Sequence, residues 1–238
     1  MIDNAKFLTT DVPIINRLLL HPDFVRCKPK NNYYHSLMHK DFGIKMSLDF
    51  RKAVESGRVV GFGHLEINIS PHYHFNNYKH NGNDFSPENS IKSITGILNY
   101  LGIKPTEYEA LKVCNVEFGI NVIPETDVKK IVDGLLLYKR TPFKFDGFPY
   151  YKKTDATSYK QIKAYAKGLH CQEVLKVPEI DINTFRFEVK SKQAKSIKTF
   201  GIYSAKDLLN ISAYSRLIQV LADEWDNILI TCCAFSTN

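Results

Sequence analysis

Four segments of the chain alternate apolar and polar residues with a period of two, the pattern of a β-strand that buries one face. Their apolar positions are Leu65, Ile67 and Ile69; Cys114, Val116, Phe118, Ile120 and Val122; Ile162, Ala164 and Ala166; and Phe185, Phe187 and Val189. The positions between them hold mostly polar residues. We therefore predict four strands that each present one apolar and one polar face.

The rest of the chain mixes predicted strands and helices. The predicted strands span residues 6–12, 42–50, 58–70, 110–123, 159–167 and 182–190; the predicted helices span 14–20, 87–101, 124–138 and most of 204–226. Residues 28–39 are polar and are predicted to be a loop. Because strands and helices do not alternate strictly, we predict an α+β fold with a largely antiparallel central β-sheet and helices packed on one face.

Composition places the chain among ordinary globular proteins. It has 238 residues, of which 44% are apolar and 24% charged, and no linker separates two parts, so a single domain over 1–238 is predicted. There is no apolar run of about 18 residues and no signal-peptide pattern at the N-terminus, which predicts no membrane association. Five scattered cysteines without a CxxC pair indicate reduced thiols and a cytoplasmic location.

The net charge of +7 is concentrated in one quarter of the sequence. Residues 150–206 hold twelve Lys or Arg and five Asp or Glu (12 − 5 = +7), whereas the remainder holds twenty of each. Aromatic residues are interleaved with these cations, and this combination suits a nucleic acid, which offers phosphates and bases. The candidate DNA-binding residues are Lys160, Lys163, Lys190 and Lys192. A solvated, lysine-rich surface is the alternative interpretation.

The polar faces of the four strands carry candidate chemistry. They hold the carboxylates Glu66, Glu117 and Glu188 and the set Lys163, Tyr165 and Lys167. In one sheet these faces would merge, placing hard oxygen ligands for Mg²⁺ or Mn²⁺ beside a tyrosine among cations, as metal-assisted phosphate chemistry requires. The alternative is a polar face that meets water, with cross-strand Glu–Lys pairs.

A histidine-rich segment follows the first of these strands. His72-Tyr73-His74 matches the His-hydrophobe-His pattern in which two imidazoles on one strand face bind a metal, and His80 is a further candidate ligand. Pro71 and the neighbouring asparagines weaken the strand character of this segment. His72 and His74 are therefore alternative metal ligands, and each of the three histidines has a plain surface-loop interpretation.

Four motifs in sequence order resemble those of the gene II replication initiators of filamentous phages and related phage and plasmid initiators. The motifs are Leu-Glu-Ile-Asn-Ile-Ser-Pro at 65–71 with Lys-His-Asn at 79–81, Asn-Val-Glu-Phe at 115–118, Ile-Lys-Ala-Tyr-Ala-Lys-Gly at 162–168, and Phe-Arg-Phe-Glu-Val at 185–189 with Lys-Thr-Phe-Gly at 198–201. The resemblance covers about residues 58–210 and implies an initiator-endonuclease fold of the HUH-like type.

That resemblance implies rolling-circle initiation, in which one strand of an origin is nicked and later rejoined through a covalent 5′-phosphotyrosine. It makes Tyr165 the nucleophile and Lys167 its electrostatic partner, and it assigns divalent-cation ligands and supporting residues. The implied ligands of Mg²⁺ or Mn²⁺ are Glu66, His80 and Glu117, and the implied supporting residues are Asn81, Arg186 and Glu188. The implied partners are phage or plasmid origin DNA and host replication proteins such as helicase and polymerase.

The sequence also departs from the family pattern. Lys79 stands where the family has Gly, and Glu117 where many members have Asp. The chain is shorter than typical members, which is compatible with a missing C-terminal region. Two alternatives therefore stay open: a non-catalytic nucleic-acid-binding replication regulator, and a conjugative relaxase. If Tyr165 is not the nucleophile, Tyr151 and Tyr159 are next in line.

Overall fold

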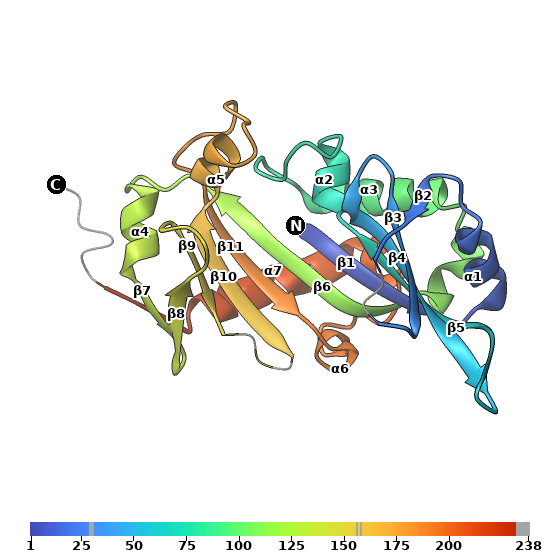
Figure 1. Cartoon of the computed structure of the whole chain (residues 1–238). Helices are drawn as coiled ribbons and strands as arrows, with labels where there is room; N and C mark the ends of the chain where they lie inside the picture. The colour runs from blue at the N-terminus through green and yellow to red at the C-terminus, as the bar shows by residue number, and fades with distance from the viewer. Residues whose placement is uncertain (29–30, 156, 158, 232–238) are drawn as a thin grey trace.

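The structure is a computed structural model that describes residues 1–28, 31–155, 157 and 159–231. Within these residues, twelve strands form one sheet in the order β12-β7-β8-β9-β10-β11-β6-β1-β5-β4-β3-β2, and neighbouring strands pair antiparallel (Figure 1). The α+β class with an antiparallel central sheet is therefore confirmed.

The strands and helices have the following bounds. The strands are β1 Ile2–Thr9, β2 Phe24–Arg26, β3 Tyr34–His39, β4 Gly43–Glu55, β5 Arg58–Ile69, β6 Lys112–Val122, β7 Leu135–Tyr138, β8 Thr141–Phe145, β9 Tyr151–Thr154, β10 Lys160–Ala166, β11 Phe185–Ser191 and β12 Ile228–Ile230. The α-helices are α1 Val12–Leu19, α2 Pro71–Phe75, α3 Pro87–Tyr100, α4 Val128–Gly134, α5 Lys167–Glu173, α6 Ala194–Lys198 and α7 Ile211–Trp225, and two 3₁₀ segments span Pro105–Ala110 and Asp207–Leu209.

The longer helices pack on the apolar face of the sheet, as predicted. Helices α3 and α7 both place side chains in the main hydrophobic core, among them Ile94 and Leu98 of α3 and Leu217 of α7. Helix α3 begins where the sequence indicated, because the Ser86 side chain accepts a hydrogen bond from the Asn89 amide and a proline occupies the first turn. Helices α2 and α5 lie at one end of the strands, at the top of Figure 1.

Several element predictions were wrong in their bounds. Residues 34–39, predicted as loop, form β3, which pairs with β4. The helix predicted over 124–138 stops at Gly134, and the next residues form β7 because they pair with β8 and β12. The first strand ends at Thr9 rather than residue 12, since the Asp11 side chain caps α1 by accepting from the Ile14 amide.

The parity prediction holds for most core positions and fails at Cys114. Leu65, Ile67, Val116 and Phe118 are fully buried. A register shift between β1 and β6 makes Lys6 pair with Asn115 and Phe7 with Val113, so Val113 is buried in the position expected for Cys114.

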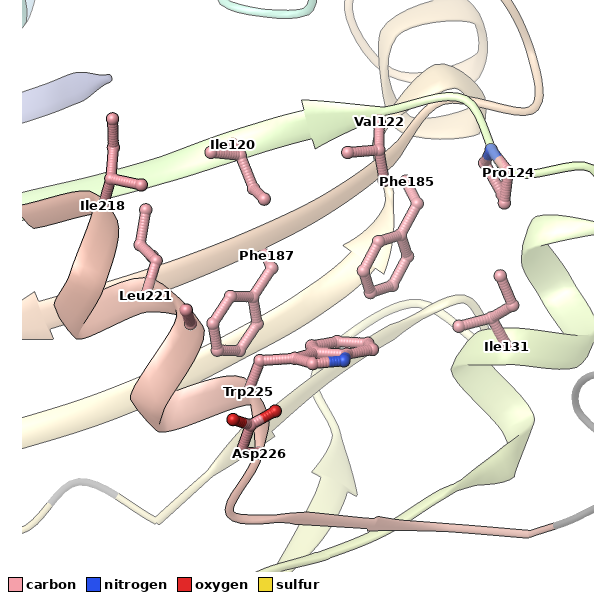
Figure 2. Close-up of a pocket in the computed structure, with 11 residues that line it drawn as sticks. Ile120, Val122, Pro124, Ile131, Phe185, Phe187, Ile218, Leu221, Trp225 and Asp226 are labelled. Carbon is pink, nitrogen blue, oxygen red and sulfur yellow. The ribbon is translucent and has the colours of Figure 1, made fainter.

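A groove of about 420 Å³ interrupts the helical cover of the apolar face between α4 and α7 (Figure 2). Ile120 and Val122 line it and are 40% and 43% exposed, so they lie on the predicted face without being buried. Trp225 packs against Phe187 inside the groove, with ring centroids 5.3 Å apart.

Two further observations concern the environment of the chain. In the part that the structure describes, no helix is both long and apolar enough to cross a membrane. Cys27, Cys114 and Cys171 are free thiols, while Cys232 and Cys233 lie outside the described residues.

Candidate functional site

The predicted polar faces of β10 and β11 meet side by side in the sheet. Lys163 pairs with Glu188, and Tyr165 pairs with Arg186, so all four side chains project from the same face. Strand β6 lies on the other side of β11 and pairs Glu117 with Lys190. The register therefore assembles acids, cations and Tyr165 on one surface, as the sequence predicted.

Glu188 is the centre of this arrangement and is 2% exposed. Its Oε1 accepts from the Tyr165 hydroxyl at 2.8 Å and from Arg186 Nε at 2.5 Å, and its Oε2 lies 3.4 Å from Lys163 Nζ. Burial alone would raise the pKa of Glu188, but the charges of Lys163 and Arg186 outweigh it and hold that pKa well below its usual range. Glu188 is thus a buried, ionised carboxylate in contact with the candidate nucleophile.

Tyr165 is 4% exposed, and its ring stacks on Tyr151 of β9 with centroids 4.4 Å apart. Burial raises the pKa of Tyr165 well above 10, and the nearby charge of Glu188 raises it further. The phenol is therefore protonated in this arrangement, and Glu188 is placed to accept its proton. Burial and Glu188 therefore oppose formation of the phenolate, although cations lie nearby.

Lys167 lies close to Tyr165 but does not contact its hydroxyl. It is the first residue of α5 rather than the last residue of a strand, and it is 1% exposed. Its Nζ donates to Asn81 Oδ1 at 2.6 Å and lies 5.6 Å from the centroid of the Tyr165 ring. Burial lowers the pKa of Lys167. The hydrogen bond from Lys167 thus connects Asn81, a predicted supporting residue, to the site.

Asp3 belongs to the site and was missed by the sequence analysis. Arg186, which is 1% exposed, forms ion pairs with both Asp3 and Glu188 and donates to Asn121 Oδ1 at 2.5 Å. Asp3 also lies 3.0 Å from His72 Nδ1. The available signal was the alternation of Ile2, Asp3 and the residues that follow, but the first strand was predicted to start at Lys6, too late to include it.

Gly119 leaves room for the buried side chain of Glu188. Gly119 pairs with Glu188 across β6 and β11. A Cβ at position 119 would lie 2.4 Å from the carbonyl oxygen of Phe187 and 2.9 Å from Glu188 Cγ. Only glycine fits this close approach without displacing β11.

The predicted metal ligands Glu66, His80 and Glu117 are not brought together. Glu66 pairs with Leu8 of β1, and Glu117 pairs with Asn4 on the other side of that strand. The two carboxylates are thus separated by about 13 Å along β1 and about 10 Å across the sheet. The residues that the structure describes contain no cluster of three His, Cys, Asp or Glu able to hold a metal.

These three residues have other neighbours. Glu66 forms an ion pair with Lys6 at 3.0 Å, and Glu117 forms ion pairs with Lys163 at 2.6 Å and Lys190 at 3.0 Å. The nearly buried His80 faces the Gly82 amide through Nδ1 at 3.3 Å. These residues therefore do not fit one metal site.

The alternative ligand pair His72 and His74 does not form on a strand face. Pro71 begins the short helix α2, so residues two apart point in different directions. His72 faces Asp3 and Asn83, whereas His74 packs toward Gly96 of α3, where a Cβ would lie 3.2 Å from His74 Cε1. The doubt that Pro71 placed on the strand character of this segment is explained, because the proline starts a helix.

A polar cleft of about 340 Å³ opens on the same face, between the Glu188 cluster and Glu66. Its lining residues are Asp3, Asn4, Lys6, Asn68, Ser70, Tyr73, Asn81, Asn115, Glu117 and Lys190. Four carboxamides and two hydroxyls offer hydrogen bonds to a bound polar group, and two lysines stand beside two carboxylates, Asp3 and Glu117. The cleft suits a phosphate or a base edge.

Three of the four predicted DNA-binding lysines carry ion pairs. Lys160 pairs with Glu224, Lys163 with Glu117 and Glu188, and Lys190 with Glu117. Lys192 forms no ion pair within the described part of the chain, and burial together with the charge of Lys190 lowers its pKa. Of the four predicted DNA-binding lysines, Lys192 is thus the one whose charge has no ion-pair partner among the described residues.

Comparisons with known proteins add little to this picture. No protein-family model matches the chain, and a search of curated proteins finds no match. A solved structure similar to it is a rolling circle replication initiator protein from Geobacillus stearothermophilus, with 10% sequence identity and a TM-score of 0.45 over 88% of this chain and 78% of that one. At this level the likeness places the chain in no family.

Proposed function

We propose that the protein is a rolling-circle replication initiator that nicks and rejoins one strand of DNA through Tyr165. The observation that carries the proposal is the hydrogen bond from the Tyr165 hydroxyl to Glu188, on a sheet face that also holds a lysine-lined polar cleft. A tyrosine hydrogen-bonded to a carboxylate supplies a nucleophile with an adjacent general base, and the polar cleft on the same face has room for a DNA phosphate. The sequence motifs point to the same tyrosine.

The proposed step exchanges one phosphodiester for another. The Tyr165 oxygen attacks a DNA phosphorus, its proton passes to Glu188, and the bond from phosphorus to the 3′ oxygen breaks. The 3′ oxygen takes up a proton from solvent water and leaves as a 3′-hydroxyl, Glu188 returns its proton to solvent, and the 5′-phosphate stays on Tyr165. The reverse attack rejoins the strand. A host polymerase would extend the free 3′-hydroxyl, and a host helicase would separate the strands.

The surrounding cations have defined tasks in this proposal. Lys163 and Arg186 keep Glu188 ionised, so that a carboxylate faces the phenol. Lys190, at the cleft, is suited to contact a DNA phosphate. Dependence on Mg²⁺ or Mn²⁺ is part of the proposal, although no step is assigned to the metal because its predicted ligands lie apart.

A second candidate function is a non-catalytic DNA-binding regulator. The burial of Tyr165 favours it, because a 4% exposed phenol reaches a phosphate only after Tyr151 or its neighbours move aside. The basic face and the polar cleft would serve binding in either case. The two candidates therefore differ in whether a covalent adduct forms.

The test is adduct formation with single-stranded DNA. The probe is a pool of 60-nucleotide strands of random sequence with a 3′ fluorophore, because the 3′ fragment is the one that stays on the tyrosine. It is incubated with Mg²⁺ or with Mn²⁺, and labelled protein is measured on a denaturing gel. We expect an adduct with the natural chain, none with Tyr165→Phe, and an unchanged yield with the control Tyr159→Phe, whose ring is 52% exposed.

The outcomes separate the candidates. An adduct that survives Tyr165→Phe would make another tyrosine the nucleophile, and mass spectrometry of the labelled peptide identifies it. Salt-dependent binding of the pool without any adduct in either metal would select the non-catalytic regulator.

A further inference from the structure

Strands β4 and β5 continue past their neighbours as a two-stranded ribbon, residues 51–64. Arg51 is the last residue of β4 that pairs with β3, and Leu65 is where the pairing of β5 with β1 ends. Beyond these residues the structure describes no further strand pairing for β4 and β5 except with each other, although the Lys52 amide still donates to the Tyr33 carbonyl oxygen at 2.9 Å. Figure 1 shows this ribbon at the lower right, projecting from the edge of the fold.

The ribbon has a tight and well-defined tip. Ser56 and Gly57 connect the strands, and both have positive φ, 48° and 78°, as a type I′ hairpin turn requires. The three residues from Ala53 to Glu55 extend the ribbon by about 10 Å, which exceeds the depth of about 8.5 Å of the major groove of B-DNA. A two-stranded ribbon also has the width that this groove admits.

The surface of the ribbon combines positive charge with exposed valines. The ribbon contains three cations, Arg51, Lys52 and Arg58, and one anion, Glu55. Residues 51–64 therefore carry a net charge of 3 − 1 = +2. Val54, Val59 and Val60 are 49%, 58% and 56% exposed. Valine methyls can contact thymine methyl groups, and arginine can bond guanine or phosphate.

We infer that this ribbon binds the major groove of duplex DNA and positions the duplex next to the polar face of the sheet. The inference rests on the proposed initiator function and adds a duplex-binding element to it. The ribbon continues β5, whose other end carries Asn68 in the polar cleft. A duplex held by the ribbon therefore lies at the end of the same strand that leads to the cleft.

Charge favours DNA over a second copy of the chain as the occupant. Two ribbons of charge +2 repel each other, whereas a duplex attracts each of them. The ribbon is also bulged between Arg51 and Lys52 and between Ala53 and Val54. Bulges increase the twist of a ribbon and disfavour edge-to-edge pairing with another sheet.

The test compares a ribbon variant with a matched hairpin variant. The ribbon variant is Arg58→Ala with Val60→Ser, and the control is Arg140→Ala with Leu136→Ser at the β7–β8 hairpin, where Leu136 is 42% exposed. Affinity is measured by fluorescence anisotropy without divalent metal for a 30-base-pair duplex pool of random sequence and for single strands from the same pool. Adduct formation and sedimentation are measured on the same proteins.

We expect the ribbon variant to bind duplex at least tenfold more weakly, with unchanged single-strand affinity and adduct yield, and the control to match the natural chain. Equal duplex affinity in the ribbon variant and the natural chain would overturn the inference, as would equal losses for duplex and single strand. A change in oligomeric state without a change in duplex affinity would make the ribbon a contact between copies. If no protein forms an adduct, the proposed nicking fails, while the metal-free duplex comparison still decides the role of the ribbon.

Discussion

Glu188 and Glu66 occupy equivalent positions by sequence pattern and very different positions in the protein. Each lies on the polar face of a strand and contacts a cation. The Glu188 side chain is 3% exposed and contacts Arg186, Lys163 and Tyr165, whereas the Glu66 side chain is 28% exposed and pairs with Lys6. The comparison teaches that strand parity selects a face, while cover from other segments decides whether that face becomes a site.

The segments that cover Glu188 are remote from it in sequence. Asn81, in the loop after α2, accepts from Lys167 and offers its carbonyl oxygen to Arg186. Arg186 is in turn paired with Asp3. The Glu66 side chain is 28% exposed, so one end of the polar face is a buried ionic network and the other is more accessible.

The largest expected difference between the two regions is the cost of removing a cation. Arg186→Met leaves Glu188 and Asp3 buried without their guanidinium partner, and we expect the free energy of unfolding to fall by about 3–5 kcal/mol. Lys6→Met removes the partner of the more exposed Glu66 and is expected to cost about 0–1 kcal/mol. Urea denaturation of both variants measures this. Similar losses for the two would mean that the buried network is no more important to stability than the surface pair.

An intermediate effect is expected from the glycine that makes room for Glu188. Gly119→Ala places a Cβ 2.4 Å from the Phe187 carbonyl oxygen, so β11 must shift, and we expect a loss of about 1–3 kcal/mol in unfolding free energy. The matched control is Gly63→Ala, where the new Cβ meets Ala53 Cβ at an ordinary 3.5 Å. A stable Gly119→Ala protein with full adduct formation would contradict the tight packing around Glu188.

The smallest expected effect is the response of Glu188 to acid. The pKa of Glu188 is lower in the folded protein than its usual value of about 4.5, so its contribution to stability is complete above pH 4.5 and is lost as the pH falls below that value. One group changes the free energy of unfolding by at most about 1.4 kcal/mol per pH unit. Urea titrations between pH 6 and 3 should therefore show a shallower decline for Glu188→Gln than for the natural chain. Parallel declines would show that Glu188 is not the group responsible.

The sequence predicted the faces of the site better than its distances. Period-two alternation placed Glu117, Lys163, Tyr165 and Glu188 on polar faces, and the sheet merges those faces. It did not reveal that β11 lies between β10 and β6, nor that β1 lies between β6 and β5. Strand order depends on contacts between segments far apart in sequence, so the separation of Glu66 from Glu117 was not predictable from spacing.

Local signals explain the other errors. Pro71 favoured a helix start over a strand, and that changes the directions of His72 and His74. Asp3 was missed because the first strand was predicted to begin at Lys6, whereas β1 begins at Ile2. The HUH-like type and the role of Tyr165 stay predictions, because they depend on motif resemblance and not on the geometry of a metal site.

The place of β1 in the middle of the sheet has a consequence for how the protein is made. Its two neighbours are β5, which ends at Ile69, and β6, which ends at Val122. Between Thr9 and Val122 the ribosome adds 122 − 9 = 113 residues, which takes about 6–23 s at 5–20 residues per second. During that interval β1, whose apolar residues include Ile2 and Phe7, lacks its second partner strand, β6. The apolar residues of β1 are thus exposed to non-specific contacts during translation. A chaperone that binds nascent chains would therefore raise the yield of folded protein.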